Sequence, residues 1–209
     1  MSALAPILTA LLDPIDAVAV PAPDAQPVPA AVLVALDAPS ALRDPARELA
    51  SIGVVLTKRR AGLRRHAGEI SFPGGRFDPS DRTLCETALR EAEEEIGLRA
   101  SEIAPLGALS VVHTLATNYV IQPFVALVDL SARAPAAGAA EARWRTSANE
   151  VEEVLELSLS EIEAGRGRTR LERRGISFET GTFTVGAHLI WGATFRILDD
   201  LLGRLRNSA

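Results

Sequence analysis

The sequence predicts an α/β fold, a sandwich of helices packed on a sheet, from two features of the chain. Aliphatic and β-branched runs of strand length recur along it, and between them lie segments with the apolar spacing and end signals of helices. The chain has 209 residues, of which 47% are hydrophobic, and Cys85 is its only cysteine. A core of this size needs no disulfide and no cysteine zinc cluster to support it.

Composition excludes several classes of partner. The formal net charge is −5, without the basic excess that a general nucleic-acid binder carries. Charged residues interrupt the hydrophobic runs, and the apolar stretch over 1–12 is too short to span a bilayer and has no basic residue before it. We therefore expect no nucleic-acid partner and no membrane segment. The single cysteine favours a reducing, cytoplasmic location.

The chain is expected to divide into two parts. Prolines concentrate in the first 45 residues, which predicts an extended and loosely held N-terminal extension over 1–29. The folded domain is then expected over 30–209, beginning with two strands that neighbour each other in one sheet. The expected elements are strands over 30–36, 51–57, 111–112 and 120–128, a hairpin over 169–185 that turns at Gly175 and Gly181, and helices over 83–96, 157–164 and 191–205.

The segment over 83–96 has the clearest helical signals. Thr83 and Glu86 have the spacing of a capping box, and Gly97 follows as the stop. One face of this helix is apolar: Cys85, Ala88, Leu89, Ala92 and Ile96. Just upstream stands the turn Phe72-Pro73-Gly74-Gly75, whose paired glycines allow the backbone to approach a ligand closely.

Three carboxylates lie beside the apolar face of this helix. At 3.6 residues per turn, Glu91, Glu94 and Glu95 fall within an arc of about 100°. Like charges at these spacings repel, and clustered carboxylate oxygens suit Mg²⁺ or Mn²⁺. Arg90 lies four residues before Glu94 and can orient or partly neutralise a carboxylate. The alternative is a solvated acidic face without a ligand.

Together these residues resemble the Nudix box. Gly75 and the segment from Arg90 to Leu98 match its usual form of a glycine, five residues, an acid, seven residues, then Arg-Glu-apolar-x-Glu-Glu-x-Gly-apolar. The first half departs from the pattern: Asp81 stands where glutamate is usual, and eight residues rather than seven separate it from Arg90. The insertion precedes the helix, so the three carboxylates should keep their register.

A second resemblance lies upstream of the box. Leu56-Thr57-Lys58-Arg59, Arg64, Gly68 and Phe72-Pro73-Gly74-Gly75 are similar to the signature of coenzyme A pyrophosphatases, although Arg60 stands where Ser or Ala is usual. Residues 190–198 also resemble the closing helix of that group.

The resemblance implies a Nudix-type α/β/α sandwich with a mixed β-sheet. It also implies hydrolysis of a diphosphate, with Glu91, Glu94 and Glu95 holding Mg²⁺ or Mn²⁺ and the Gly75 carbonyl as a further ligand. For coenzyme A or its acyl derivatives, the products would be 3′,5′-ADP and (acyl-)4′-phosphopantetheine. The substrate-binding residues would be Arg59, Arg64, Gly74 and Gly75, although the two arginines could equally be ordinary solvated residues of an arginine-biased chain.

The catalytic residues implied by the resemblance are Glu94, Glu95 and Arg90, with a general base that varies across the superfamily. Glu150, Glu152 and Glu153 are the acids that a later segment offers. If Val151, Val154 and Leu155 face inward from a helix, Glu150 and Glu153 share a face. We expect Glu153 to be the base; any of these acids could also be a plain surface charge.

Other functions stay open at this point. The nearest alternative is a Nudix hydrolase of another nucleoside diphosphate derivative, such as ADP-ribose or a dinucleotide. A catalytically silent Nudix-like sensor is a different class, although such proteins usually lack a box glutamate. A homodimer is also possible.

Overall fold

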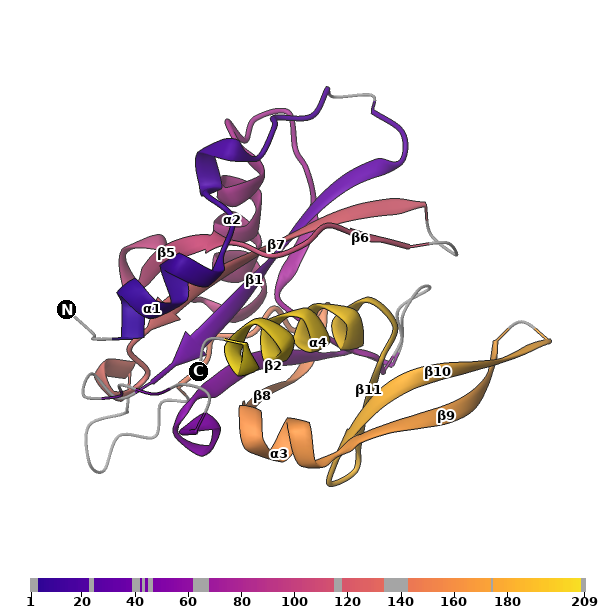
Figure 1. The fold of residues 1–209 in the computed structure, drawn as a ribbon. Coiled ribbons are helices and arrows are strands. Elements are labelled where there is room, and N and C mark those ends of the chain that lie inside the picture. Colours follow the sequence, from indigo (N-terminus) through magenta and orange to yellow (C-terminus); the bar gives the residue numbers. More distant parts are fainter. Residues whose placement is uncertain are drawn as a thin grey trace.

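The structure is a computed structural model, and it describes residues 4–22, 25–38, 42, 44, 47–61, 68–114, 118–133, 143–173 and 175–207. A central mixed sheet separates two hydrophobic cores, one under helix α2 and the other under α1, α3, α4 and a second, three-stranded sheet (Figure 1). The predicted α/β sandwich with a mixed sheet is confirmed.

The central sheet is organised around two long parallel strands, β1 and β7, which pair from Val28–Tyr119 to Asp37–Val128. The remaining pairings in this sheet are antiparallel, with β8 on β2 and with β5 and β6 on β7. The strands are β1 (Val28–Asp37), β2 (Gly53–Arg59), β3 (Ile70–Ser71), β4 (Gly74–Arg76), β5 (Ile103–Ala108), β6 (Val112–His113), β7 (Tyr119–Val128) and β8 (Val151–Ser158).

The middle of this sheet is split. β1 and β2 pair at Leu36–Val54 and Asp37–Gly53, and towards the other end β3 pairs with β2 while β4 pairs with β1. The Leu33 N–H also donates to the Pro73 carbonyl at 2.9 Å. The short segment over 70–76 therefore fills the gap between two diverging strands, and this places the double glycine at the centre of the sheet.

Helix α2 (Leu84–Ile96) covers one face of the sheet. Its small residues Ala88 and Ala92 are fully buried, so the helix lies close to the strands. Thr83 caps it by accepting the Glu86 N–H at 3.1 Å, and Gly97 ends it with φ 68°. The predicted capping box differs by one residue, because the Glu86 carboxylate accepts the N–H of Arg82.

The other face carries α3 (Leu159–Ala164), α4 (Gly192–Arg206) and the second sheet of β9 (Arg166–Arg173), β10 (Ile176–Val185) and β11 (His188–Trp191). The predicted turn at Gly175 is confirmed, with φ 76°. Gly181 is not a turn: it lies inside β10, and the Phe195 ring occupies the space of its missing side chain. The predicted helix over 157–164 begins at Leu159 because the residues before it complete β8.

The N-terminal segment differs from the expectation of an extended, loosely held chain. Residues Leu4–Leu11 form α1, and Leu4 and Leu8 are fully buried in the core shared with α4. Arg204 of α4 donates to the Leu11 carbonyl at 2.7 Å. The expectation is therefore wrong for α1, while a domain boundary at residues 29 and 30 stays a prediction.

Short 3₁₀ turns complete the described structure: Ile15–Ala17, Leu49–Ser51, Ala100–Glu102 and Ser131–Arg133. In the ranges described above, no helix has the length and apolarity needed to cross a membrane.

Candidate functional site

Glu95 is the most buried of the three predicted carboxylates, with 3% of its side chain exposed. One of its oxygens accepts the Gly74 N–H at 3.3 Å, and the other lies 3.5 Å from Arg59 Nη1. Burial raises the pKa of Glu95 to about 7; Arg59 and the Gly74 N–H act in the opposite direction, while Glu91 and Glu150 add to the rise. The site thus holds a carboxylate that would gain from a nearby positive charge.

Glu91 lies against the second glycine of the turn. A Cβ atom at Gly75 would be 2.3 Å from Glu91 Oε1, so only glycine lets this carboxylate approach the turn as it does. Burial raises the pKa of Glu91, and Arg90 partly opposes the rise. The double glycine therefore lies against two carboxylates. Gly74 donates its N–H to Glu95, and the absence of a side chain at Gly75 leaves room for Glu91.

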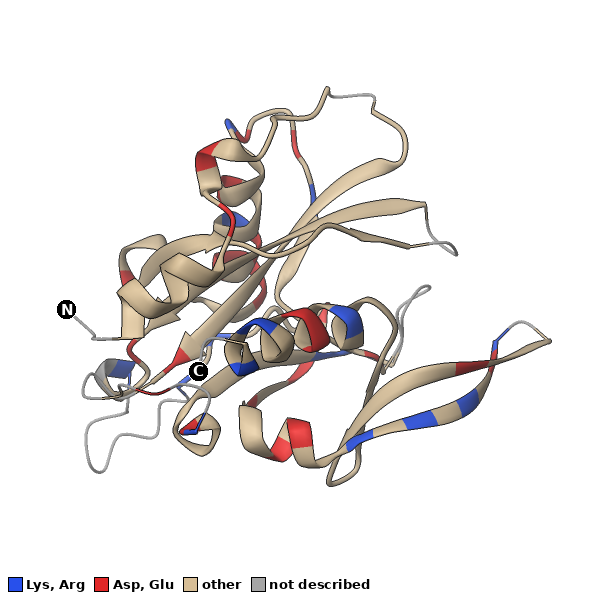
Figure 2. Ribbon diagram, in the orientation of Figure 1, with Lys and Arg blue, Asp and Glu red and all other residues tan. Residues whose placement is uncertain are grey.

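Glu94 is the exposed member of the group. Its side chain is 60% exposed and contacts Arg90 Nη1 at 3.2 Å. Acidic residues recur along α2 (Figure 2). In the part of the chain with described positions, no three acidic, histidine or cysteine side chains already converge on one point as metal ligands. The predicted arc is present, with two carboxylates at the turn and one facing solvent.

Arg90 links these carboxylates to the loop before the helix. Its guanidinium donates to Glu91 at 2.9 Å and to Glu94 at 3.2 Å, and it forms a two-pronged contact with Asp81 at 3.0 Å on each side. The hydrogen bonds to Asp81 and then to Glu91 raise the pKa of Arg90 above its ordinary value, against the effect of burial. Arg90 is consequently a fixed positive charge beside the acidic edge of α2.

Asp81 holds Arg90 in spite of the extra residue in the loop. Its carboxylate is 7% exposed and also accepts the Thr87 hydroxyl at 2.8 Å. Burial pushes its pKa upward, but the hydrogen bonds from Arg90, Thr87 and the Asp78 N–H outweigh this and keep the pKa below its ordinary value. Asp81 therefore contributes to the site by positioning Arg90.

The NUDIX domain family matches residues 37–175 of this chain. The chain belongs to the Nudix family. It is 32% identical over 151 residues to a protein of Salmonella paratyphi B described as the uncharacterized Nudix hydrolase NudL, covering 71% of this chain and 73% of that protein.

Solved structures show the same Nudix fold at low sequence identity. A Nudix hydrolase from M. smegmatis, RenU, has a TM-score of 0.51 at 16% identity, covering 86% of this chain and 84% of that one. The NUDIX domain of Shewanella oneidensis NrtR, solved in complex with ADP ribose, has a TM-score of 0.50 at 16% identity and covers 88% of both chains.

As a Nudix hydrolase, the chain belongs to a family of pyrophosphohydrolases that act on nucleoside diphosphate derivatives and generally use divalent metal ions. The residues at the double glycine fit such an ion. The donors gathered there are carboxylate oxygens, which hard divalent cations prefer, and the missing Gly75 side chain leaves Glu91 room to reach the turn.

Glu150 is brought to the Nudix box by a turn after residue 146. The Ser147 N–H donates to the Glu95 carbonyl at 2.9 Å, and the Glu150 N–H donates back to Ser147 at 3.0 Å. The Arg60 N–H donates to the Glu150 carbonyl at 2.9 Å. The Glu150 backbone is thus held between β2 and the end of α2, and its charge contributes to the raised pKa values of Glu91 and Glu95.

Glu153 lies elsewhere. The helical interpretation of 149–154 is wrong, because Val151–Ser158 is the strand β8. Lys58 is opposite Glu153 and Arg59 is opposite Val151, so Glu152 is the extra residue of a bulge. Val154 packs in the core under α2 and Leu155 in the core under α4; by strand alternation Glu153 shares the Leu155 side, away from the box.

The arginines upstream of the box differ in their contacts. Arg59 is at the site, on the carboxylate of Glu95, and Lys58 beside it pairs with Glu152 at 2.6 Å. The side chain of Arg60, the departure from the signature, donates to the Ala148 carbonyl and helps to hold the turn that carries Glu150. Arg64 lies outside the described residues.

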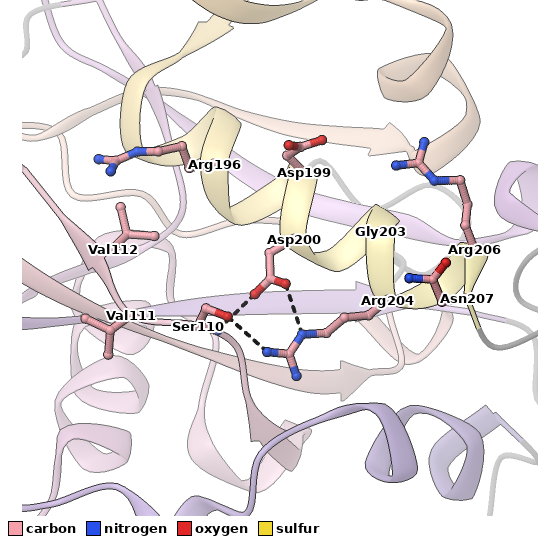
Figure 3. A pocket seen from close by; sticks show the side chains of 10 residues that line it. All are labelled: Ser110, Val111, Val112, Arg196, Asp199, Asp200, Gly203, Arg204, Arg206 and Asn207. Atoms are coloured by element: carbon pink, nitrogen blue, oxygen red, sulfur yellow. Dashed lines mark hydrogen bonds and ion pairs between the residues drawn. The ribbon is translucent and has the colours of Figure 1, made fainter.

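A separate hollow of about 580 Å³ lies between α4 and residues 110–112, on the face of the sheet opposite α2 (Figure 3). Its central charges satisfy one another: Asp200 accepts from the Ser110 N–H at 2.9 Å and from Arg204 at 3.0 Å, and Arg204 also donates to the Ser110 hydroxyl. This hollow lacks the box residues, so the candidate site is the one at the double glycine.

Proposed function

We propose that this Nudix hydrolase cleaves the diphosphate bond of coenzyme A or its acyl derivatives, giving 3′,5′-ADP and (acyl-)4′-phosphopantetheine. The observation that carries the proposal is the meeting of both halves of the upstream signature at one box glutamate. Arg59, from the Leu-Thr-x-Arg half, contacts one oxygen of Glu95, and Gly74, from the Phe-Pro-Gly-Gly half, donates to the other. The signature segment therefore belongs to the active site.

We assign Glu91, Glu94 and Glu95, with the Gly75 carbonyl, to hold Mg²⁺ or Mn²⁺. Such an ion lowers the pKa of a bound water and offsets the charge of the diphosphate. Arg90 keeps Glu91 and Glu94 oriented through its own hold on Asp81. Arg59 and Arg64 are assigned to the phosphate oxygens, which guanidinium groups bind through paired hydrogen bonds.

A general base is needed to take the proton of the attacking water. Glu153 was the expected base from the sequence, whereas the described geometry favours Glu150. The charge of Glu150 helps to raise the pKa values of Glu91 and Glu95, whereas the charge of Glu153 helps to raise the pKa of Lys58. We therefore assign the base to Glu150 and retain Glu153 as the residue to test against it.

A substrate panel tests the proposal directly. Coenzyme A, an acyl-coenzyme A, ADP-ribose and a dinucleotide are incubated with the protein and Mg²⁺ or Mn²⁺, with an EDTA control, and the products are separated. Coenzyme A or its acyl derivative should have the highest kcat/KM, and EDTA should abolish turnover. A much higher kcat/KM for ADP-ribose would assign the chain to another Nudix substrate.

Two variants on α2 separate an enzyme from a silent sensor. Glu95→Gln should lower kcat by roughly a hundredfold or more, because the site loses a buried charge that balances the ion. Glu93→Gln is the matched control, since Glu93 is exposed on the same helix outside the carboxylate arc. Equal rates for the two variants would remove the mechanism, and absence of hydrolysis with intact ligand binding would favour a sensor.

A further inference from the structure

Two arginines contact the carboxylates of the site, and they differ in the number of hydrogen bonds that their guanidinium groups form. Arg90 forms hydrogen bonds to three carboxylates and to the Arg76 carbonyl. Arg59 has a single contact with Glu95, at 3.5 Å, and its Nε atom is buried without a hydrogen-bond partner among the described residues. Such an unsatisfied donor is costly, so its persistence at a site calls for an explanation.

The Arg59–Glu95 contact has the geometry of a loose pairing. A guanidinium that is a permanent partner of a carboxylate usually forms two parallel hydrogen bonds of about 2.7–2.9 Å. Here the second oxygen of Glu95 is already taken by the Gly74 N–H. Arg59 is therefore near enough to balance the charge of Glu95 but is not locked to it.

We propose that Arg59 is a temporary counter-ion of Glu95, which yields this carboxylate when a divalent cation binds and then turns its guanidinium to the diphosphate of the substrate. The inference rests on the proposed function in taking Glu95 as a metal ligand and a diphosphate as the substrate. It adds that the two binding events share one side chain. The Arg59 side chain is 27% exposed although its Nε atom is buried, so part of the side chain is open to solvent.

The consequence is a positive coupling between the cation and the diphosphate. Without the cation, Arg59 is occupied by the buried carboxylate and adds little to diphosphate binding. With the cation on Glu95, the charge of this carboxylate is already balanced and the cation repels the guanidinium. Arg59 then becomes available to phosphate oxygens. Coupling of this kind is reciprocal, so each ligand should strengthen binding of the other.

The test uses Arg59→Met in the full chain, with Mn²⁺ as the probe cation and α,β-methylene-ADP as an unreactive diphosphate. Mn²⁺ binding without any nucleotide is measured by electron paramagnetic resonance. It should become about threefold tighter in the variant, the size expected on removal of a partly exposed competing ion pair. Arg82→Met is the control: Arg82 is exposed and pairs with Glu86 near the start of α2.

Calorimetry of α,β-methylene-ADP then measures the coupling. Mn²⁺ should increase its affinity in the wild type, and Arg59→Met should lower the affinity about tenfold with Mn²⁺ but leave it unchanged without Mn²⁺. Arg59→Gln provides a second neutral side chain in case the first variant unfolds, and a thermal melt checks both.

The outcomes are separable. Unchanged or weaker Mn²⁺ binding in both Arg59 variants would overturn the role of counter-ion. An equal loss of nucleotide affinity with and without Mn²⁺ would overturn the transfer of Arg59 to the diphosphate. If the wild type and Glu95→Gln bind Mn²⁺ equally, the metal assignment in the proposed function fails instead.

Discussion

At the scale of single residues, Asp81 shows how a side chain keeps its place in a site although the loop before it is longer. The loop turns on itself, with the Asp81 N–H donating to the Asp78 carbonyl at 2.9 Å, and the carboxylate still reaches Arg90. The extra residue is absorbed before the helix begins at Leu84. Arg90 is consequently held by Asp81 from the loop before the helix as well as by Glu91 and Glu94 on the helix.

Replacing Asp81 by Asn should lower the free energy of unfolding at neutral pH by about 1–2 kcal/mol, because Arg90 loses a partly buried partner. The pKa of Asp81 is lowered in the folded protein, so its stabilisation is complete above the unfolded value of 3.8 and is lost as pH falls through the folded value. Urea unfolding at several pH values should show the gap between variant and wild type closing in acid. A gap that stays constant would contradict this, and the exposed Asp16→Asn serves as control.

Single substitutions also distinguish Glu150 from Glu153 as the general base. Glu150→Gln should reduce kcat by about a hundredfold, the usual contribution of a positioned base, and should change the pH dependence of kcat. Glu153→Gln should remain close to the wild type, because Glu153 is exposed and strand alternation places it on the side of β8 away from the box. A larger loss in Glu153→Gln than in Glu150→Gln would reverse the assignment.

At the scale of elements, the segment over 70–76 matters most. It belongs to the sheet through β3 and β4 and also supplies the turn against which two carboxylates of α2 rest. The two glycines have different surroundings. A side chain at Gly74 would meet the backbone of β1, at 2.3 Å from the Ala31 carbonyl, whereas one at Gly75 would meet the flexible end of Glu91.

Alanine at these two positions should therefore have different effects. Gly74→Ala should cost about 3 kcal/mol or more of stability, since the β1 backbone cannot move aside. Gly75→Ala should cost less than about 1 kcal/mol, because Glu91 can rotate away, but kcat should fall with the displaced carboxylate. Thermal melts and steady-state kinetics of both variants give the comparison. Equal loss of stability in the two would show that the backbone contact does not matter.

Elements with local signals agree best with the sequence. Helix α2 is predicted to within a residue, because Thr83, the apolar face and Gly97 all lie in or beside it. The segment after Asn149 could not be predicted in this way. Its valines and leucine fit a helical or a strand period, and pairing with β2, far away in the chain, makes it a strand with a bulge.

At the scale of the whole molecule, the N-terminal helix α1 is part of the fold. The prolines around it suggest a free extension, yet α1 inserts Leu4 and Leu8 into the core that α4 and β5 help to enclose. Arg204 fastens the end of this helix from the opposite end of the chain. Helices α1 and α4 thus stabilise each other on the face of the sheet opposite α2.

Leu8→Ala should lower the free energy of unfolding by about 2–4 kcal/mol, because it leaves a cavity in the core. The loss cannot exceed the free energy that is lost when α1 detaches from the core. Thr9→Ala, at an exposed neighbour on the same helix, should change stability by less than about 0.5 kcal/mol. Denaturant unfolding measures both. An unchanged stability of Leu8→Ala would restore the picture of a loosely held extension.

The fold class and the box carboxylates can be predicted from the sequence, because both depend on short patterns. The sequence does not predict the features that depend on distant contacts: the approach of Glu150 to Glu95 through Ser147, the face on which Glu153 lies, or the docking of α1 on α4. The loose hold of Arg59 on Glu95 likewise becomes visible only when β2 and α2 are seen together.

The wedge of residues 70–76 between β1 and β2 has one more consequence, for motion. Most glycine-rich turns exchange their amide hydrogens quickly because they open without disturbing the rest of the protein. Here the Gly74 amide is held by Glu95, and the flanking strands hold the segment on both sides. Deuterium should therefore enter this turn only as slowly as the centre of the sheet opens, so that the double-glycine turn is among the last parts of the protein to exchange.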